Sequence, residues 1–391
     1  MKKLFHARCF TAVLFVIVIG LMCLLGARSF ARGVYFVSKA LAQGEAAGPE
    51  YIELHYNNDF PGKNIWVTLN GGVQRLAGVR RIKDLLRLDN GQILSLTERA
   101  DMGGHADALL AFSRRMEERG IPVVYVSTLT KADRAGKMLP PGIEDFSNDN
   151  ADRFLRSLRE RGMDCLDLRD LEDENTEHYG QFFRTDLHWT PETGFLAFTE
   201  IDRWLTQRNA ELSVPARCTD REQYRFTVYP SFFFGSAGRQ LGPLYTGKDD
   251  FTVIEPLFDT ALLLTGEGVE PAREGSFSET LLYPELLREK DQFSMSMYSV
   301  YCGGEFSWLS ARHLPEETTP DTNGKTLLML GDSFSQVVMP FFALGYDRVD
   351  LIDLRLFDAD LTTYIDECRP DLILVMYAPH SLSETSLFRF S

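Results

Sequence analysis

The sequence predicts an α/β fold in which helices cover both faces of a parallel sheet, giving three layers. Segments with helical spacing alternate with short apolar runs of strand length, and this alternation is typical of parallel sheets. Glycines end two of the helical segments, at Gly120 and Gly162, where left-handed C-caps are expected. The alternating segments, in chain order, are His105–Glu118, Pro122–Val126, Ala151–Arg161, Met163–Leu168, Leu327–Leu330, Val349–Leu354, 359–368 and Leu372–Tyr377.

The chain begins with a segment suited to a membrane. An unbroken apolar run at residues 9–27 follows Lys2, Lys3 and Arg8. As a helix this run spans about 28 Å, close to the roughly 30 Å hydrocarbon core of a bilayer. We therefore expect residues 1–27 to be an N-terminal membrane anchor with the rest of the chain on the extracytoplasmic side. The alternative is a cleaved signal peptide and a secreted protein, because residues 29–31 offer a small-residue cleavage site.

Residues 28–50 are small and polar, so we expect a linker there and one catalytic domain over residues 51–391. Asn-Gly pairs predict hairpin turns at residues 70–71 and 90–91, and hence a β-meander over residues 64–96. Residues 209–320 interrupt the later alternation. We interpret this stretch as an insertion beside the site, with a turn at Asp249-Asp250 and an alternating strand at Phe293–Met297.

Composition excludes some classes of function. The formal net charge is −15 and no basic run follows the N-terminal segment, which argues against nucleic acid as a partner. The cysteines beyond residue 27 show no paired metal-ligand spacing, so we expect no metal and no cofactor. One disulfide is possible after export, but the sequence leaves its pairing open. These cysteines are Cys165, Cys218, Cys302 and Cys368.

Two short motifs together predict a Ser-His-Asp triad. Ser333 follows an apolar strand in a Gly-Asp-Ser turn, at the carboxyl edge of the sheet where ligands bind in such folds. A helix is expected to start there, and its free N–H groups suit an oxyanion. Asp186 and His188 are two residues apart, so in an extended segment both side chains point to the same side. Such a carboxylate would orient the imidazole as a base for serine.

The surrounding residues resemble a known family. Phe-Arg-Thr-Asp-Leu-His-Trp-Thr at 183–190 and Gly-Asp-Ser-Phe-Ser at 331–335 look like the DHHW family, although Leu187 replaces the family's first histidine. That family is similar to the SGNH-hydrolase-like domains of bacterial alginate and cell-wall polysaccharide O-acetyltransferases. The likeness extends from about Asn64 to the C-terminus. It implies a flavodoxin-like, SGNH-hydrolase-like fold, with Ser333 as nucleophile, His188 as base and Asp186 as orienting acid.

The resemblance also implies a function. We expect an exported, membrane-anchored serine O-acetyltransferase that moves acetyl groups onto a cell-envelope or exported polysaccharide through an acetyl-Ser333 intermediate. Its expected partners are the polysaccharide acceptor and a multi-spanning membrane O-acyltransferase that supplies acetyl. A carbohydrate acetyl esterase with the same triad and a non-catalytic polysaccharide-binding module are the alternatives.

The sequence leaves the second hydrogen-bond donor of the expected oxyanion hole unassigned. Ala378-Pro379-His380 stands where the wider superfamily usually supplies an oxyanion-hole asparagine. The Ser333 N–H can donate one hydrogen bond to an oxyanion, and Gly235, Ser236 and Arg355 are the candidates for a second donor or a substrate contact.

Overall fold

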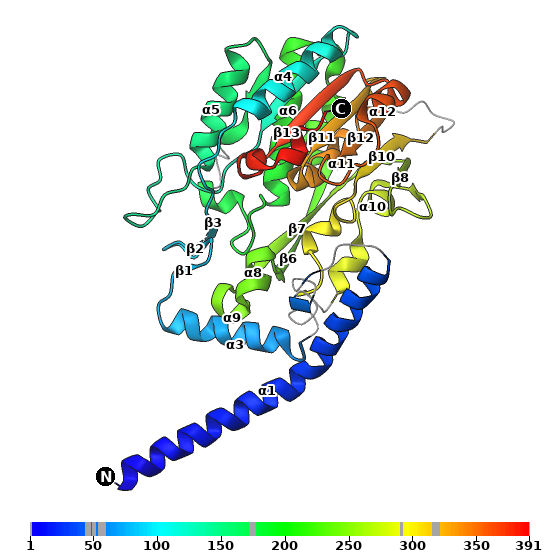
Figure 1. The fold of residues 1–391 in the computed structure, drawn as a ribbon. Coiled ribbons are helices and arrows are strands. Elements are labelled where there is room, and N and C mark those ends of the chain that lie inside the picture. Colours follow the sequence, from blue (N-terminus) through cyan, green and yellow to red (C-terminus); the bar gives the residue numbers. More distant parts are fainter. Residues whose placement is uncertain are drawn as a thin grey trace. The chain divides into compact units, whose positions relative to one another are not determined.

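The protein is described by a computed structural model that covers residues 2–43, 48, 52–53, 60–171, 177–289, 292–314 and 321–390 (Figure 1). The chain forms two compact units, Met1–Gln74 and Arg75–Ser391.

The N-terminal helix is longer than the apolar run predicts. Helix α1 spans Lys2–Ala42 and so continues through most of the expected linker. No proline interrupts residues 28–42, and their alanine, arginine, leucine and lysine residues favour helix. Residues 12–42 of this helix are long and apolar enough to cross a membrane. The rest of the predicted linker lies almost entirely outside the described residues.

The predicted β-meander is half right. Residues 63–76 form helix α3 (Lys63–Leu76), so the expected hairpin at residues 70–71 is wrong. Ile65, Leu69, Val73 and Leu76 recur at helical spacing, and this period outweighs the turn preference of one Asn-Gly pair. The second hairpin is confirmed, with Gly91 in its turn at a φ of 85°. The antiparallel strands of this small sheet are β1 (Arg81–Ile82), β2 (Leu85–Arg87) and β3 (Ile93–Ser95).

The central sheet has the order β5-β4-β13-β11-β12-β10-β8-β9. The pairs from β5 to β12 are parallel, as expected, whereas β10, β8 and β9 add an antiparallel edge. The sheet is therefore mixed, and its antiparallel edge comes from within the segment that the sequence assigned to an insertion. The strands are β4 (Val123–Ser127), β5 (Cys165–Asp167), β8 (Leu262–Gly266), β9 (Arg273–Gly275), β10 (Trp308–His313), β11 (Thr326–Gly331), β12 (Arg348–Ile352) and β13 (Leu372–Tyr377).

Helices cover both faces of this sheet, which confirms the three-layer expectation (Figure 1). The alternation along β13 shows why: Leu372, Leu374 and Met376 pack in one core, and the intervening residues in the other. Helices α6 (Pro191–Arg208) and α11 (Met339–Phe342) cover the first face. The second face is covered by α4 (Gly103–Glu117), α5 (Ser147–Arg159) and α12 (Leu361–Cys368).

Two details of the insertion differ from the prediction. Asp249 opens strand β7 (Asp249–Pro256), which pairs with β6 (Tyr224–Phe233), instead of lying in a turn. The expected strand at Phe293–Met297 is absent from this described segment, where turns lead into a 3-10 helix at Met297–Val300. Apolar alternation forms a strand only where another strand accepts its hydrogen bonds. The remaining short helices are α7 (Ala216–Thr219), α8 (Ser236–Leu241), α9 (Pro243–Thr246) and α10 (Phe277–Thr280).

Candidate active site

Ser333 lies directly beyond the carboxyl end of β11. Asp332 precedes it and fixes the turn, because its carboxylate accepts hydrogen bonds from Phe334 N at 3.1 Å and from Ala378 N at 2.8 Å. The helix expected after the serine is only a 3-10 helix, Ser333–Val337, before the short α11. The dipole of so short a helix is weaker than that of a long α-helix, so it contributes less to stabilising an oxyanion. Within the described residues, the Ser333 N–H makes no backbone hydrogen bond.

Asp186 and His188 lie in a loop that is closed by backbone pairing between Phe182 and Trp189. The segment between them is a bend and not the extended segment that the sequence predicts. Both side chains still face the same way, because the His188 ring lies 2.6 Å from the Asp186 carboxylate through Nδ1. That carboxylate also accepts from His188 N at 3.1 Å. Trp189 is fully buried and anchors the end of the loop in the core. Thr190 caps α6, accepting from Thr193 N at 3.3 Å.

The structure brings all three predicted triad residues together. The distance from His188 Nε2 to Ser333 Oγ is 2.7 Å, and that from His188 Nδ1 to Asp186 Oδ1 is 2.6 Å. An ionised carboxylate can only accept, so the proton on His188 is placed at Nδ1. Nε2 then accepts from the serine hydroxyl, as a general base requires. The rings of Tyr298 and Phe334 flank the imidazole, with centroids 4.3 and 5.0 Å away.

The Asp186 carboxylate is buried and its charge is well supported. Burial by itself raises the pKa of this group, but the charge of His188 and hydrogen bonds from His188 and Ser236 lower that pKa well below the usual range. Ser236 N donates to Asp186 Oδ2 at 2.5 Å. The carboxylate is therefore ionised at neutral pH, as the orienting member of a triad must be.

Gly235 and Ser236 have a different place from the one that the sequence suggested. Their backbone N–H groups donate to Thr185 Oγ1 and to the Asp186 carboxylate, so neither N–H is free for an oxyanion at Ser333. A Cβ atom on Gly235 would lie 2.4 Å from Asp186 Cβ and 2.5 Å from Thr185 O, which explains the glycine. Both residues instead hold the acid in position, a role that becomes visible only once β6 brings them to the loop.

Arg355 forms a bidentate ion pair with Asp353, two residues earlier in the chain. Its Nε lies 2.9 Å from Asp353 Oδ1, and its second contact joins a terminal nitrogen to Oδ2 at 2.5 Å. The side chain is partly exposed, and a second carboxylate, that of Glu305, lies 3.8 Å away. This guanidinium is thus held in place by neighbouring carboxylates, and the structure shows no contact from it to the triad.

A buried lysine that the sequence analysis missed supports the loop. Lys131 Nζ donates to the backbone carbonyl oxygens of Phe183 at 2.7 Å, Asp186 at 2.6 Å and Arg184 at 3.3 Å. It follows strand β4, and no motif marks it in the sequence. The ammonium group thus ties the acid-bearing loop to the edge of the central sheet.

We expect Lys131→Met to lower kcat roughly 10- to 100-fold with little change in KM, since small misplacements of catalytic groups have effects of that size. Lys137→Met, an exposed lysine in the same loop, is the matched control. Burial lowers the pKa of Lys131 to about 7, although Asp186 and Asp249 oppose this. Between pH 7 and about pH 10.4 the unfolded wild type binds a proton at Lys131 that the folded protein lacks. The unfolding free energy of the wild type should therefore increase with pH over this range, relative to that of Lys131→Met. Parallel pH profiles of unfolding and an unchanged kcat would contradict this role.

Among the residues that the structure describes, no group of three His, Cys, Asp or Glu side chains is arranged to hold a metal ion. The four cysteines of the larger unit are free thiols, so none of the possible disulfides forms here.

Comparisons with known proteins agree with the α/β fold. Residues 90–225 match the family model described as the SGNH hydrolase-like domain of the acetyltransferase AlgX. The fold is SGNH hydrolase-like. The resemblance predicted from the sequence is confirmed, and this family match includes Asp186 and His188 but ends before Ser333. The comparison with curated proteins gives no match.

Solved structures share this SGNH hydrolase-like fold at low sequence identity. PatB1 from Bacillus cereus aligns with a TM-score of 0.64 at 17% identity, covering 78% of this chain and 99% of the other. A PatB1 structure with a sulfonyl adduct aligns with a TM-score of 0.62 at 15% identity, with the same coverage. A DHHW family protein from Eubacterium siraeum aligns with a TM-score of 0.56 at 16% identity, covering 78% of this chain and 93% of the other. The acetyltransferase family match indicates an enzyme that acts on acyl groups.

Proposed function

We propose that this protein is a serine O-acetyltransferase that moves acetyl groups onto a cell-envelope or exported polysaccharide through an acetyl-Ser333 intermediate. The observation that carries the proposal is the aligned series of hydrogen bonds from Ser333 through His188 to Asp186, at 2.7 and 2.6 Å. The AlgX-type acetyltransferase match supports acetyl as the group transferred.

The reaction has two halves that use the same base. Ser333 Oγ attacks the carbonyl carbon of an acetyl donor while its proton passes to His188 Nε2. When the tetrahedral intermediate collapses, the bond to the donor's leaving oxygen breaks and His188 returns the proton to that oxygen. A sugar hydroxyl then gives its proton to His188 and attacks the acetyl-serine ester, which frees Ser333 with its proton restored. Asp186 stabilises the imidazolium in each half.

The proposed site of action is the extracytoplasmic side of a membrane. Helix α1 supports an N-terminal anchor, because residues 12–42 are long and apolar enough to span a bilayer. Acetyl donors are made in the cytoplasm, so an anchored enzyme of this kind needs a supplier that carries acetyl across the membrane. We propose a multi-spanning membrane O-acyltransferase as that partner.

The deciding experiment incubates the full-length protein with an activated acetyl ester, with and without an oligosaccharide acceptor. Mass spectrometry should find an acetyl group on Ser333 without acceptor and acetylated oligosaccharide with it. Release of acetate at the same rate in both samples would indicate an esterase instead. If a competent donor puts no acetyl label on Ser333, the result would favour a non-catalytic polysaccharide-binding module.

A further inference from the structure

Helix α3 carries an exposed apolar stripe. Five large apolar side chains of this helix are between 44% and 90% exposed. Since an α-helix turns about 100° per residue, all five fall within an arc of about 100° on one side. Beyond α1, they make up half of the exposed large apolar side chains that the structure describes. We call this set the α3 stripe, and its members are Ile65, Trp66, Leu69, Val73 and Leu76.

The side of α3 that is buried is the side opposite the stripe. Gly71 is the buried residue of the helix, and Asn64 and Thr68, on the same side, are partly buried. A helix that packs on a soluble core turns its apolar side inward, so the orientation of α3 is inverted. An exposed apolar patch of this kind marks a surface that contacts something else.

Basic residues flank the stripe and follow it in the chain. Residues 60–83 contain five lysines and arginines and no aspartate or glutamate, in a chain of net charge −15. Lys63 and Arg75 lie on either side of the stripe, where long side chains can extend past apolar surface to place their charges in water. The other three follow α3 directly, and they are Arg80, Arg81 and Lys83. Arg80 pairs with Asp89 at 2.5 Å, whereas Arg81 and Lys83 are exposed.

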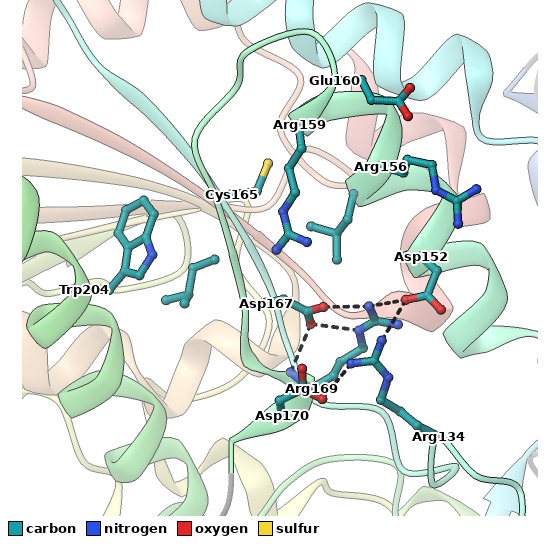
Figure 2. Close-up of a pocket in the computed structure, with 12 residues that line it drawn as sticks. Arg134, Asp152, Arg156, Arg159, Glu160, Cys165, Asp167, Arg169, Asp170 and Trp204 are labelled. Atoms are coloured by element: carbon teal, nitrogen blue, oxygen red, sulfur yellow. Dashed lines mark hydrogen bonds and ion pairs between the residues drawn. The ribbon is translucent and has the colours of Figure 1, made fainter.

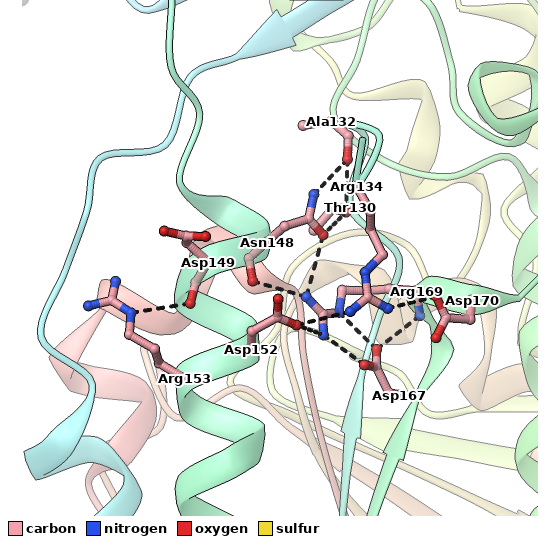
Figure 3. A network of polar contacts seen from close by, with 10 residues as sticks. All are labelled: Thr130, Ala132, Arg134, Asn148, Asp149, Asp152, Arg153, Asp167, Arg169 and Asp170. Atoms are coloured by element: carbon pink, nitrogen blue, oxygen red, sulfur yellow. Dashed lines mark hydrogen bonds and ion pairs between the residues drawn. The ribbon is translucent and has the colours of Figure 1, made fainter. Parts of the chain in front are cut away.

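A second concentration of arginines, in a hollow along β5, is balanced by acids. The hollow has a volume of about 620 Å³ and is lined by four arginines and four carboxylates (Figure 2). Arg169, which is only 1% exposed, contacts Asp167 at 2.7 Å and Asp152 at 2.6 Å, and Arg134 contacts Asp152 at 3.1 Å (Figure 3). These charges cancel, so this hollow offers no net attraction to an anion. Residues 60–83 differ because their own sequence supplies no acid.

The chain itself brings α3 to a membrane. Residues 12–42 of α1 are long and apolar enough to span a bilayer, and only residues 43–62 separate α1 from α3. A segment of that length reaches at most about 70 Å, and a tether so short gives α3 a high effective concentration at the bilayer surface. Trp66 adds to this, because tryptophan is enriched where lipid meets water.

We propose that α3 lies in the surface of an anionic bilayer, with its stripe among the acyl chains and its basic residues at the headgroups. Tryptophan and leucine on one side of a helix, with lysine and arginine beside them, are typical of interfacial helices. The inference goes beyond the reaction at Ser333 and rests on the anchor proposed for α1. Residues 77–80 alone separate α3 from β1 of the larger unit. The helix would therefore hold that unit at the membrane, where the proposed partner would deliver acetyl.

The test uses the full-length protein in vesicles whose lipids carry bromine near the headgroup end of their acyl chains. Helix α1 contains no tryptophan, so its insertion alone gives no quenching of tryptophan fluorescence. The wild type should be quenched, and Trp66→Phe should lose the quenched component. Trp204→Phe, which removes a partly exposed tryptophan of the larger unit, is the matched control and should keep it. A wild type without quenching would overturn the proposal.

The stripe is tested by making it polar. Leu69→Asn/Leu76→Asn should lose most of the quenching, because the apolar surface that enters the acyl chains is reduced. Leu257→Asn/Leu356→Asn makes the same change at exposed leucines outside α3 and should be quenched like the wild type. Since all four side chains are exposed, the unfolding midpoint in detergent should change little in either variant. Equal quenching in the two double variants would contradict a role for the stripe.

The charge is tested by lipid composition. Quenching of the wild type should be stronger with phosphatidylglycerol in the vesicles than with phosphatidylcholine alone, and the difference should shrink in high salt. Arg81→Gln/Lys83→Gln should reduce this difference. Arg156→Gln/Arg159→Gln, which removes the same charge from exposed arginines of the β5 hollow, should leave it unchanged. The same quenching in both lipids would overturn the assignment to an anionic surface.

The remaining outcomes separate the membrane from other occupants and from the anchor. A blue shift of Trp66 emission that grows with protein density, without quenching by brominated lipid, would assign the stripe to a second copy of the chain and overturn the proposal. Protein that resists extraction by alkaline carbonate but is not quenched would end only the inference on α3. Release by carbonate would end the anchor and this inference together. Acetyl labelling of Ser333 is independent of each of these results.

Discussion

Replacing Ser333 with alanine should abolish acyl transfer and acetyl labelling while leaving the fold intact. The hydroxyl is the only nucleophile in contact with His188 Nε2 among the described residues, and no acetyl-enzyme can form without it. In a serine hydrolase such a loss lowers kcat by roughly 10⁶-fold. Ser333 is only half-buried, so the free energy of unfolding should change by less than about 1 kcal/mol. Ester turnover and denaturant unfolding measure the two effects on the same preparation.

Ser335 is the matched control for this substitution. It lies two residues further along, its side chain is fully buried, and its hydroxyl has no hydrogen-bond partner within the described residues. Ser335→Ala should therefore keep most of the activity and lose no hydrogen bond. An acetyl label on Ser335, or activity that survives Ser333→Ala, would move the site assignment while leaving the fold unchanged.

The triad was predictable because its members stand in short local patterns. Asp186 and His188 lie two residues apart in the sequence. Ser333 follows an apolar strand, and in a parallel sheet the end of every strand lies at the edge where ligands bind. The residues that position the triad were not predictable. Lys131 reaches its three carbonyl groups, and Ser236 reaches Asp186, across more than 45 residues of chain. Their local sequence carries no trace of these contacts, since backbone atoms supply one partner in each.

The errors in the predicted fold have two different origins. In residues 65–76 two local signals compete, a helical period of about 3.6 residues and the turn preference of one Asn-Gly pair, and the helical period decides the structure. Strands β8, β9 and β10 were missed for another reason. They are antiparallel and come from a stretch without alternating helices, so the rhythm that revealed the parallel strands is missing there. Their place at the sheet edge depends on pairing between β10 and β12, a long-range contact.

Replacing Asp186 with asparagine should lower kcat by roughly 10⁴-fold, the loss seen when a triad aspartate is changed in this way. The amide has one oxygen where the carboxylate uses two, and when that oxygen accepts from Ser236 N the NH₂ group faces His188 N and Nδ1. That contact favours the tautomer with the proton on Nε2, and an Nε2–H cannot take the serine proton. The KM for the activated ester should change little, because the ester binds at Ser333 and not at the buried acid.

The same substitution should alter the response to acid. The folded-state pKa of Asp186 is depressed, so its ionised form stabilises the fold above the unfolded value of about 3.9, and this stabilisation is lost as the pH falls below that value. The difference in unfolding free energy between wild type and Asp186→Asn should therefore shrink between pH 5 and pH 3.

A double variant separates a triad from two independent effects. If Asp186 acts through His188, then Asp186→Asn/His188→Ala should lose no more activity than His188→Ala alone, because members of a catalytic unit are not additive. Multiplied losses would instead mean that the carboxylate contributes to turnover by a route other than the imidazole. The 2.6 Å contact between Asp186 Oδ1 and His188 Nδ1 predicts the first result, since the buried carboxylate reaches Ser333 only through that ring.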